Sequence, residues 1–141
     1  MSYVIDASVA AKIFIIEDYS DRAMEIINAH IRGYLSLFAP TLIVYELGNV
    51  FWKHPQITSE KARTFIKKFL DLQINLIDIY SDDELLKTAC DISQSRDITF
   101  YDASYIALAE KNETKLITAD VEICSKSPAI AVLIEKFKSE L

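Results

Sequence analysis

Two aspartates stand just after short β-prone runs in the sequence. Asp6 follows the run at residues 3–5, and Asp120 follows the run at residues 115–118. When helical segments separate parallel strands, functional groups collect just beyond the carboxyl ends of those strands. Both aspartates therefore occupy positions at which the functional residues of a parallel sheet are usually found.

Glu46 is the only charged residue in the apolar stretch at residues 41–52, which is predicted to be helical. A carboxylate on a buried helix face is costly unless it is paired or bound to a metal. Asn49 lies three residues further along, on the same face of that helix. Together the two residues form a polar spot on an otherwise apolar helix, and this pattern is typical of a functional site.

Each aspartate of interest also has a structural interpretation. Asp6 and Asp120 could be turn or cap residues where a strand leads into a helix, which is the commoner role of a single aspartate at such a place. Asp102 lies three residues after Thr99, and this pair matches a capping box. For a single aspartate taken alone, residue type and spacing leave both interpretations open.

Taken together, the four carboxylates predict a cluster of like charges, two at strand ends and two on helices that face them. Such a cluster repels itself unless a cation is bound. Hard oxygen ligands favour Mg²⁺ or Mn²⁺ over zinc, and His30 and His54 are isolated and in no metal-binding spacing. The chemistry that follows is metal activation of water for an in-line displacement at a phosphate.

The elements that would position these groups alternate between strands and helices. Strands are predicted at residues 3–5, 35–39, 74–80, 115–118 and 129–134. Helices are predicted after an N-cap at Ser8, at 20–31, at 41–53, at 58–70, after a capping box of Ser81 and Glu84, at 99–109, and in a charged tail after 134. This alternation predicts an α/β fold with a mostly parallel sheet and helices on its faces.

Composition bounds the architecture. The chain has 141 residues, 51% of them apolar, with 2 Gly and 3 Pro, and this predicts a single domain over residues 1–141. Its apolar runs are too short to span a bilayer, and no basic region precedes an apolar stretch, so we expect a soluble, cytoplasmic protein. Cys90 and Cys124 lie in apolar-patterned segments and are predicted to be buried, reduced thiols.

The charge balance argues against a simple nucleic-acid-binding protein. A formal net charge of −6 opposes nonspecific attraction to a polyanion, although a metal bound in a carboxylate cluster would cancel part of that charge locally. Lys61, Arg63, Lys67 and Lys68 form a basic run on the helix predicted at 58–70. A solvated face is its default interpretation, and a surface that tracks RNA is the alternative.

Four segments resemble, in order, the four acidic motifs of PIN domains: VIDASV at residues 4–9, YELGNV at 45–50, TFYDASY at 99–105 and LITAD at 116–120. The middle and late motifs look most like those of VapC-type toxins. The resemblance extends from residue 4 to about residue 120. One such motif would be weak evidence, but four in order at plausible spacing are strong.

The resemblance implies a PIN-like three-layer fold and an RNA endonuclease that uses Mg²⁺ or Mn²⁺. By this likeness Asp6, Glu46 and Asp102 are the core carboxylates, and Asp120 is the fourth. Further residues would support the ligands or contact the substrate: Ser8, Asn49 and Thr118. The resemblance also implies the toxin role in a toxin–antitoxin pair, with a small antitoxin as partner and a homodimer as the usual assembly.

Two other functions remain as alternatives. A phosphatase of the haloacid dehalogenase type also begins with a strand and an aspartate, but it needs a second aspartate at the position that Ser8 occupies. A non-catalytic PIN-like module would bind RNA or protein without cutting it. Loss of an acidic residue would mark such a module, and all four are present.

Overall fold

Within residues 1–138, which the computed structural model describes, five short strands form one parallel sheet in the order β3-β2-β1-β4-β5. The strands are β1 (Ser2–Ile5), β2 (Ser36–Pro40), β3 (Asn75–Ile77), β4 (Leu116–Thr118) and β5 (Ala131–Leu133). Their apolar residues face helices on both sides, as expected of a parallel sheet. The predicted α/β architecture with a parallel sheet is confirmed.

Strand order reverses between β1 and β4, which lie side by side in the middle of the sheet. The chain first adds β2 and β3 on one side of β1, and then returns to add β4 and β5 on the other. Ile5 pairs with Ile117, so the next residue along β1, Asp6, lies level with Thr118. Such a reversal is where open parallel sheets leave a crevice for ligands at the carboxyl ends of their strands.

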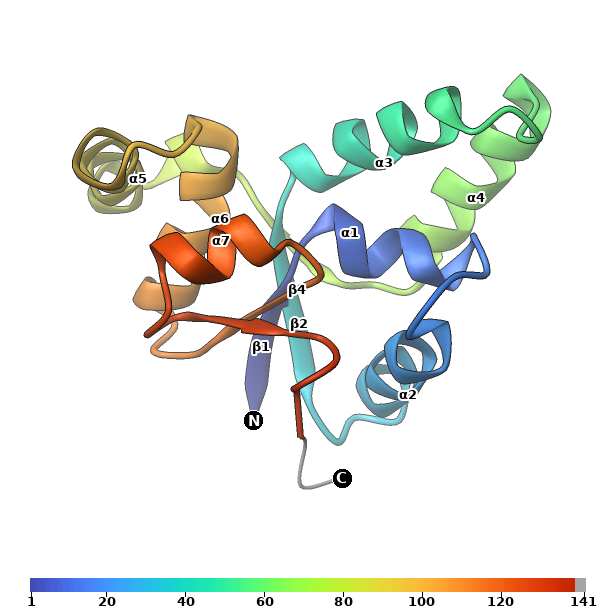
Figure 1. Cartoon of the computed structure of the whole chain (residues 1–141), viewed down its shortest axis with the longest axis horizontal. Coiled ribbons are helices and arrows are strands. Elements are labelled where there is room, and N and C mark those ends of the chain that lie inside the picture. The colour runs from blue at the N-terminus through green and yellow to red at the C-terminus, as the bar shows by residue number, and fades with distance from the viewer. Residues whose placement is uncertain (139–141) are drawn as a thin grey trace.

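Helices cover both faces of this sheet. In Figure 1, α1, α2 and α4 lie on one side of the strands, and α5, α6 and α7 lie on the other. The α-helices are α1 (Ala7–Ala10), α2 (Ser20–Ile31), α3 (Leu42–Lys53), α4 (Ser59–Asp71), α5 (Asp83–Arg96), α6 (Phe100–Lys111) and α7 (Val121–Lys126), and the 3-10 turns are η1 (Ala11–Ile13) and η2 (Ile79–Ser81). The three-layer arrangement predicted for the chain is confirmed.

Helix α6 is the most deeply buried helix. Every residue from Ala103 to Leu108 is buried, as is Ala109, because the helix is apolar on all sides after its first turn. It contacts β1, β2 and β4 on one side and α5 on another. The body of α6 that follows Asp102 is thus packed against the sheet and α5.

Several predicted boundaries are wrong for local reasons. Helix α1 is capped by Asp6 and not by Ser8, and α5 is capped by Asp82 and not by Ser81. The strand predicted at residues 74–80 is shorter, since β3 pairs with only three residues of β2 before the chain turns into η2. Helix α7 is absent from the prediction because six residues are too few to show a helical period.

The predicted charged helical tail is not a helix where the structure describes it. Residues 134–136 form a turn, and residues 139–141 lie outside the described part of the chain. The burial predicted for the cysteines is also wrong for Cys90, which is exposed, whereas Cys124 is half-buried. Helix α5 turns Leu85, Ala89 and Ile92 toward the core. Cys90, the residue after Ala89, therefore lies on the opposite, exposed side of the helix.

No helix in residues 1–138 has the length and apolar character needed to cross a membrane.

Candidate active site

Asp6 is buried at the carboxyl end of β1, with 5% of its surface exposed. Its Oδ1 accepts hydrogen bonds from the Ser8 backbone N–H at 3.1 Å, the Ser8 hydroxyl at 2.5 Å and the Val9 N–H at 3.3 Å. The two backbone bonds make Asp6 the N-cap of α1, as the structural interpretation of this residue predicted. Capping uses Oδ1 and leaves the second oxygen directed elsewhere.

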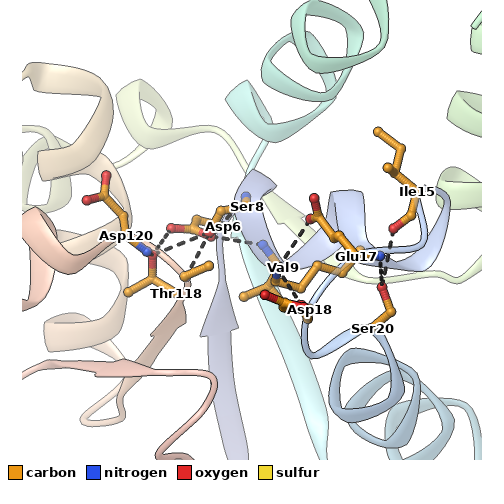
Figure 2. A network of polar contacts seen from close by, with 11 residues as sticks. Asp6, Ser8, Val9, Ile15, Glu17, Asp18, Ser20, Thr118 and Asp120 are labelled. Carbon is orange, nitrogen blue, oxygen red and sulfur yellow. Dashed lines mark hydrogen bonds and ion pairs between the residues drawn. The ribbon is translucent and has the colours of Figure 1, made fainter. Parts of the chain in front are cut away.

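Thr118 and Ser8 join the ends of β1 and β4. Thr118 is fully buried, and its hydroxyl donates to Asp6 Oδ2 while accepting the Asp120 N–H at 3.0 Å. The Ser8 hydroxyl likewise accepts the Ala119 N–H at 2.9 Å while it donates to Asp6. Figure 2 shows these contacts crossing between the two strand ends. Both hydroxyl protons are therefore committed to Asp6, whose Oδ2 receives a single donor.

Glu46 lies on α3 and is half-buried. Its Oε1 accepts a hydrogen bond of 2.5 Å from the hydroxyl of Tyr105, a residue of α6 that is only 1% exposed. The sequence left pairing and metal binding open as ways to offset the burial of Glu46, and the structure shows that Glu46 is paired with Tyr105. Tyr105 itself was not among the predicted site residues, although a tyrosine one turn after Asp102 in a buried helix was the available signal.

Asp102 and Asp120 both lie in or before the first turn of a helix. Asp102 is half-buried on α6, where its backbone N–H donates to the Thr99 hydroxyl at 3.1 Å. Asp120 is exposed and caps α7, since its Oδ1 accepts from Glu122 N at 2.8 Å and from Ile123 N at 3.4 Å. The Thr99 cap predicted for α6 is thus confirmed, and Asp120 has a structural role as well.

Electrostatics link the four carboxylates. Burial raises the pKa of Asp6, and the hydrogen bonds from Ser8 and Thr118 oppose that rise. Burial also raises the pKa of Glu46, the Tyr105 hydrogen bond opposes it, and the charges of Asp6 and Asp102 add to it. The pKa of Asp102 is raised by burial first and then by the charge of Asp120. Asp6, Glu46 and Asp102 are each held in a place that disfavours their negative charge, and a nearby cation would relieve that cost.

The donor set suits a hard divalent cation in its chemistry. Carboxylate oxygens are what Mg²⁺ and Mn²⁺ prefer, and Asp6 Oδ2 retains a lone pair for a ligand. Among the described residues, no three side chains of His, Cys, Asp or Glu stand close enough together to make a finished metal cage. The four-carboxylate ligand set therefore stays a prediction, supported by charge and donor type.

The remaining predicted residues differ in their surroundings. Asn49 is exposed on α3, one turn beyond Glu46, so its amide is available to a substrate. His30 binds main chain on both ring nitrogens, since Nδ1 accepts from Leu37 N at 3.1 Å and Nε2 lies 3.1 Å from the Leu72 carbonyl. His30 therefore has a structural role, since it joins α2 to the main chain of two other segments.

A second polar network stabilises the loop that follows α1 (Figure 2). Lys12 is buried, and its Nζ donates to Glu17 at 3.2 Å and to the Asp18 carbonyl at 2.8 Å. The Ser20 hydroxyl donates to the Ile15 carbonyl and accepts the Glu17 N–H. These bonds fix the loop between η1 and α2. The loop follows the α1–η1 segment that begins at Asp6, so the C-terminal end of that segment is fixed as well.

Similarity to known proteins extends over nearly the whole chain. A family model described as PIN domain matches residues 3–127. Ribonuclease VapC3 of Pyrobaculum aerophilum is 30% identical over 133 residues, which are 92% of this chain and 98% of that protein. Exonuclease VapC9 of the same organism is 34% identical over 89 residues, which are 61% of this chain and 63% of that protein.

Solved structures share the fold. A crystal structure of a Pyrobaculum aerophilum protein has a TM-score of 0.67 and 26% identity, with 96% of this chain and 90% of that chain covered. VapBC2 of Rickettsia felis, solved with a DNA fragment of its promoter, has a TM-score of 0.71 and 13% identity, with 94% and 98% covered. At this identity the second structure is evidence for the fold alone.

Proposed function

Because the chain belongs to the PIN-domain family, we propose that it is a metal-dependent endoribonuclease and the toxin of a toxin–antitoxin pair. The observation that carries the proposal is the buried Asp6 at the strand-order reversal, electrostatically linked to Glu46, Asp102 and Asp120. The similarity to a protein named Ribonuclease VapC3 over nearly the full length of both chains supports RNA as the substrate.

Four residues would hold the cation: Asp6, Glu46, Asp102 and Asp120. When bound, Mg²⁺ or Mn²⁺ supplies a more acidic water nucleophile and positive charge for the phosphate. Asp6 would contribute Oδ2, since three donors already occupy its Oδ1. Ser8 and Thr118 orient that carboxylate and favour its ionised form by donating both of their hydroxyl protons to it. Asn49, exposed beside Glu46, would contact the substrate.

Within residues 1–138, no activated serine, threonine or cysteine nucleophile lies beside Asp6. The Ser8 hydroxyl donates its proton to the Asp6 carboxylate and accepts a backbone N–H, so neither histidine nor lysine activates it. The phosphatase alternative requires a carboxylic acid at the position of Ser8, so the residue type there argues against it. Hydrolysis by water, with displacement of one ribose oxygen from phosphorus, is the reaction that the carboxylates support.

The experiment that tests the activity uses circular and linear RNA of the same sequence, with and without Mg²⁺. An endonuclease cuts both forms, whereas an exonuclease requires an end and leaves the circle intact. The exonuclease is a real second candidate, because one relative carries that name. Chelator should abolish cleavage. A protein that binds both RNAs and cuts neither would be the non-catalytic PIN-like module.

The proposed partners are a cognate antitoxin and a second copy of the chain. The exposed side chains of Tyr45 and Trp52 on α3, 76% and 77% accessible, provide aromatic surface for association. Sedimentation of the purified protein, alone and with the product of any small gene encoded beside it, tests both partners. A protein that sediments as a monomer and does not bind the neighbouring gene product would contradict this part of the proposal.

A further inference from the structure

The hydroxyl of Tyr105 is a buried polar group that the proposed chemistry does not itself require. Tyr105 lies on α6, one helical turn after Asp102, and is 1% exposed. Its hydroxyl donates to Oε1 of Glu46 on α3 at 2.5 Å, across 59 residues of sequence. A single hydrogen bond therefore ties a carboxylate of one helix to the rigid, buried body of another.

We propose that Tyr105 is a positioning residue that holds Glu46 toward the carboxylate cluster and thereby increases the affinity of the site for a divalent cation. The inference rests on the proposed function, since it concerns the same site. It concerns a residue that neither contacts the substrate nor serves as a ligand in that proposal.

The burial of the Tyr105 hydroxyl indicates that its hydrogen bond has a role. A phenol hydroxyl in the core is costly unless it is hydrogen-bonded, and phenylalanine would fill the same space without that cost. Glu46 Oε1 is the partner that the structure records for this hydroxyl. The single proton of Tyr105 is thus directed at one oxygen of Glu46, which leaves Oε2 for another ligand.

The forces on Glu46 show why it needs such a partner. Asp6 and Asp102 both repel its negative charge, and Glu46 is only half-buried, so a free side chain would turn toward solvent. A donor from the buried helix opposes that movement. Burial, followed by the charge of Glu46, keeps the pKa of Tyr105 far above its ordinary value, so the phenol remains a donor.

The test measures Mn²⁺ binding by calorimetry on the metal-free full chain, up to millimolar Mn²⁺. Tyr105→Phe keeps the ring and removes the donor, and it should raise the Kd by about 10- to 100-fold, the usual effect of losing a group that supports a metal ligand. Tyr3→Phe is the matched control, because the Tyr3 hydroxyl bonds to Met1 Sδ at the opposite end of β1. Its Kd should equal that of the unchanged protein.

A double-mutant cycle shows whether Tyr105 acts through Glu46. Glu46→Gln should weaken Mn²⁺ binding, and Tyr105→Phe added to it should weaken binding no further. Thermal melting of each metal-free variant checks the fold, and Tyr105→Met, which also fills the core without a hydroxyl, should repeat the loss of affinity.

The outcomes separate the inference from the proposed function. If the unchanged protein binds Mn²⁺ and Tyr105→Phe binds it equally well, the inference is overturned and the metal site stands. The inference is also overturned if Tyr105→Phe lowers the Mn²⁺ affinity as much in the Glu46→Gln background as it does in the unchanged protein. If the unchanged protein binds no Mn²⁺, the metal-dependent function fails, and the inference fails with it.

Discussion

At the scale of residues, the two carboxylate oxygens of Asp6 have different surroundings. Its Oδ1 caps α1, and its Oδ2 faces Thr118 beside the end of β4. A carboxylate has enough lone pairs for both, so a capping role does not argue against a metal-binding one. The same holds for Asp120, whose Oδ1 caps α7.

We expect Asp6→Asn and Asp102→Asn each to lower RNA cleavage by more than about 100-fold, because each removes a charge that would hold the cation. This loss exceeds the usual effect of removing a group that only supports a metal ligand. Circular dichroism should show an unchanged fold. Asp91→Asn is the matched control, since Asp91 is exposed on α5 and pairs with Lys87. Near-normal turnover in Asp6→Asn would leave that residue with its capping role alone.

Burial of Asp6 also predicts how stability depends on pH. Its pKa is raised above the ordinary value of 3.8, so between the unfolded and folded pKa values the folded protein binds more protons. Stability of the metal-free protein should therefore fall as pH rises through the folded pKa, and be regained as pH falls toward about 4. Urea unfolding measured at several pH values in chelator tests this.

The control for that pH series is Asp6→Asn, in which this group no longer titrates. The difference in stability between the variant and the unchanged protein should favour the variant at neutral pH and shrink as the pH is lowered. A difference that stays constant with pH would show that burial of the Asp6 charge costs the fold nothing.

At the scale of elements, the first turn of α6 carries both a cap and a carboxylate. The Thr99 hydroxyl accepts from Asp102 N, and the Thr58 hydroxyl accepts in the same way from Lys61 N at the start of α4. The two caps are chemically matched, but only one belongs to a helix that bears a predicted ligand.

Thr99→Ala and Thr58→Ala should each lower the free energy of unfolding by about 1 kcal/mol, the usual cost of losing an N-cap. Only Thr99→Ala should also weaken Mn²⁺ binding and RNA cleavage, because fraying of the first turn of α6 displaces Asp102. Urea denaturation and calorimetry measure the two effects. Equal metal affinity in both variants would mean that Asp102 is positioned without its cap.

Elements with long patterns could be predicted from sequence, and short ones could not. Helix α2 matches its predicted range of residues 20–31, because its apolar residues recur over three turns. Helix α7 has one buried residue, Ile123, so it leaves no period to detect. The positions of Asp6 and Glu46 follow from local patterns. The bond from Tyr105 to Glu46 depends on how α3 meets α6, which no local pattern contains.

At the scale of the whole molecule, negative charge dominates both the chain and its proposed site. The net charge is −6, and the four basic residues of α4 are exposed, as their solvated interpretation predicted: Lys61, Arg63, Lys67 and Lys68. In the proposed function, attraction of RNA would therefore come from a bound cation and from local contacts more than from the general field. A basic partner, in contrast, is attracted by the site directly.

The same acidity predicts how an antitoxin would inhibit the protein. A guanidinium group binds carboxylates in a planar, often bidentate fork, so a tail that carries Arg suits the cluster of Asp6, Glu46 and Asp102. We therefore expect the tail to compete with the cation for the same oxygens, with apolar side chains of the tail anchored on α3. A peptide of that tail should bind less tightly as Mn²⁺ is raised, and higher Mn²⁺ should restore RNA cleavage. Calorimetry and cleavage assays across a Mn²⁺ series measure both effects, with an Arg-to-Ala peptide as the control. Peptide affinity that is constant over the series and unchanged by Asp102→Asn would place the tail away from the carboxylates, and inhibition would then have to act through another surface of the molecule.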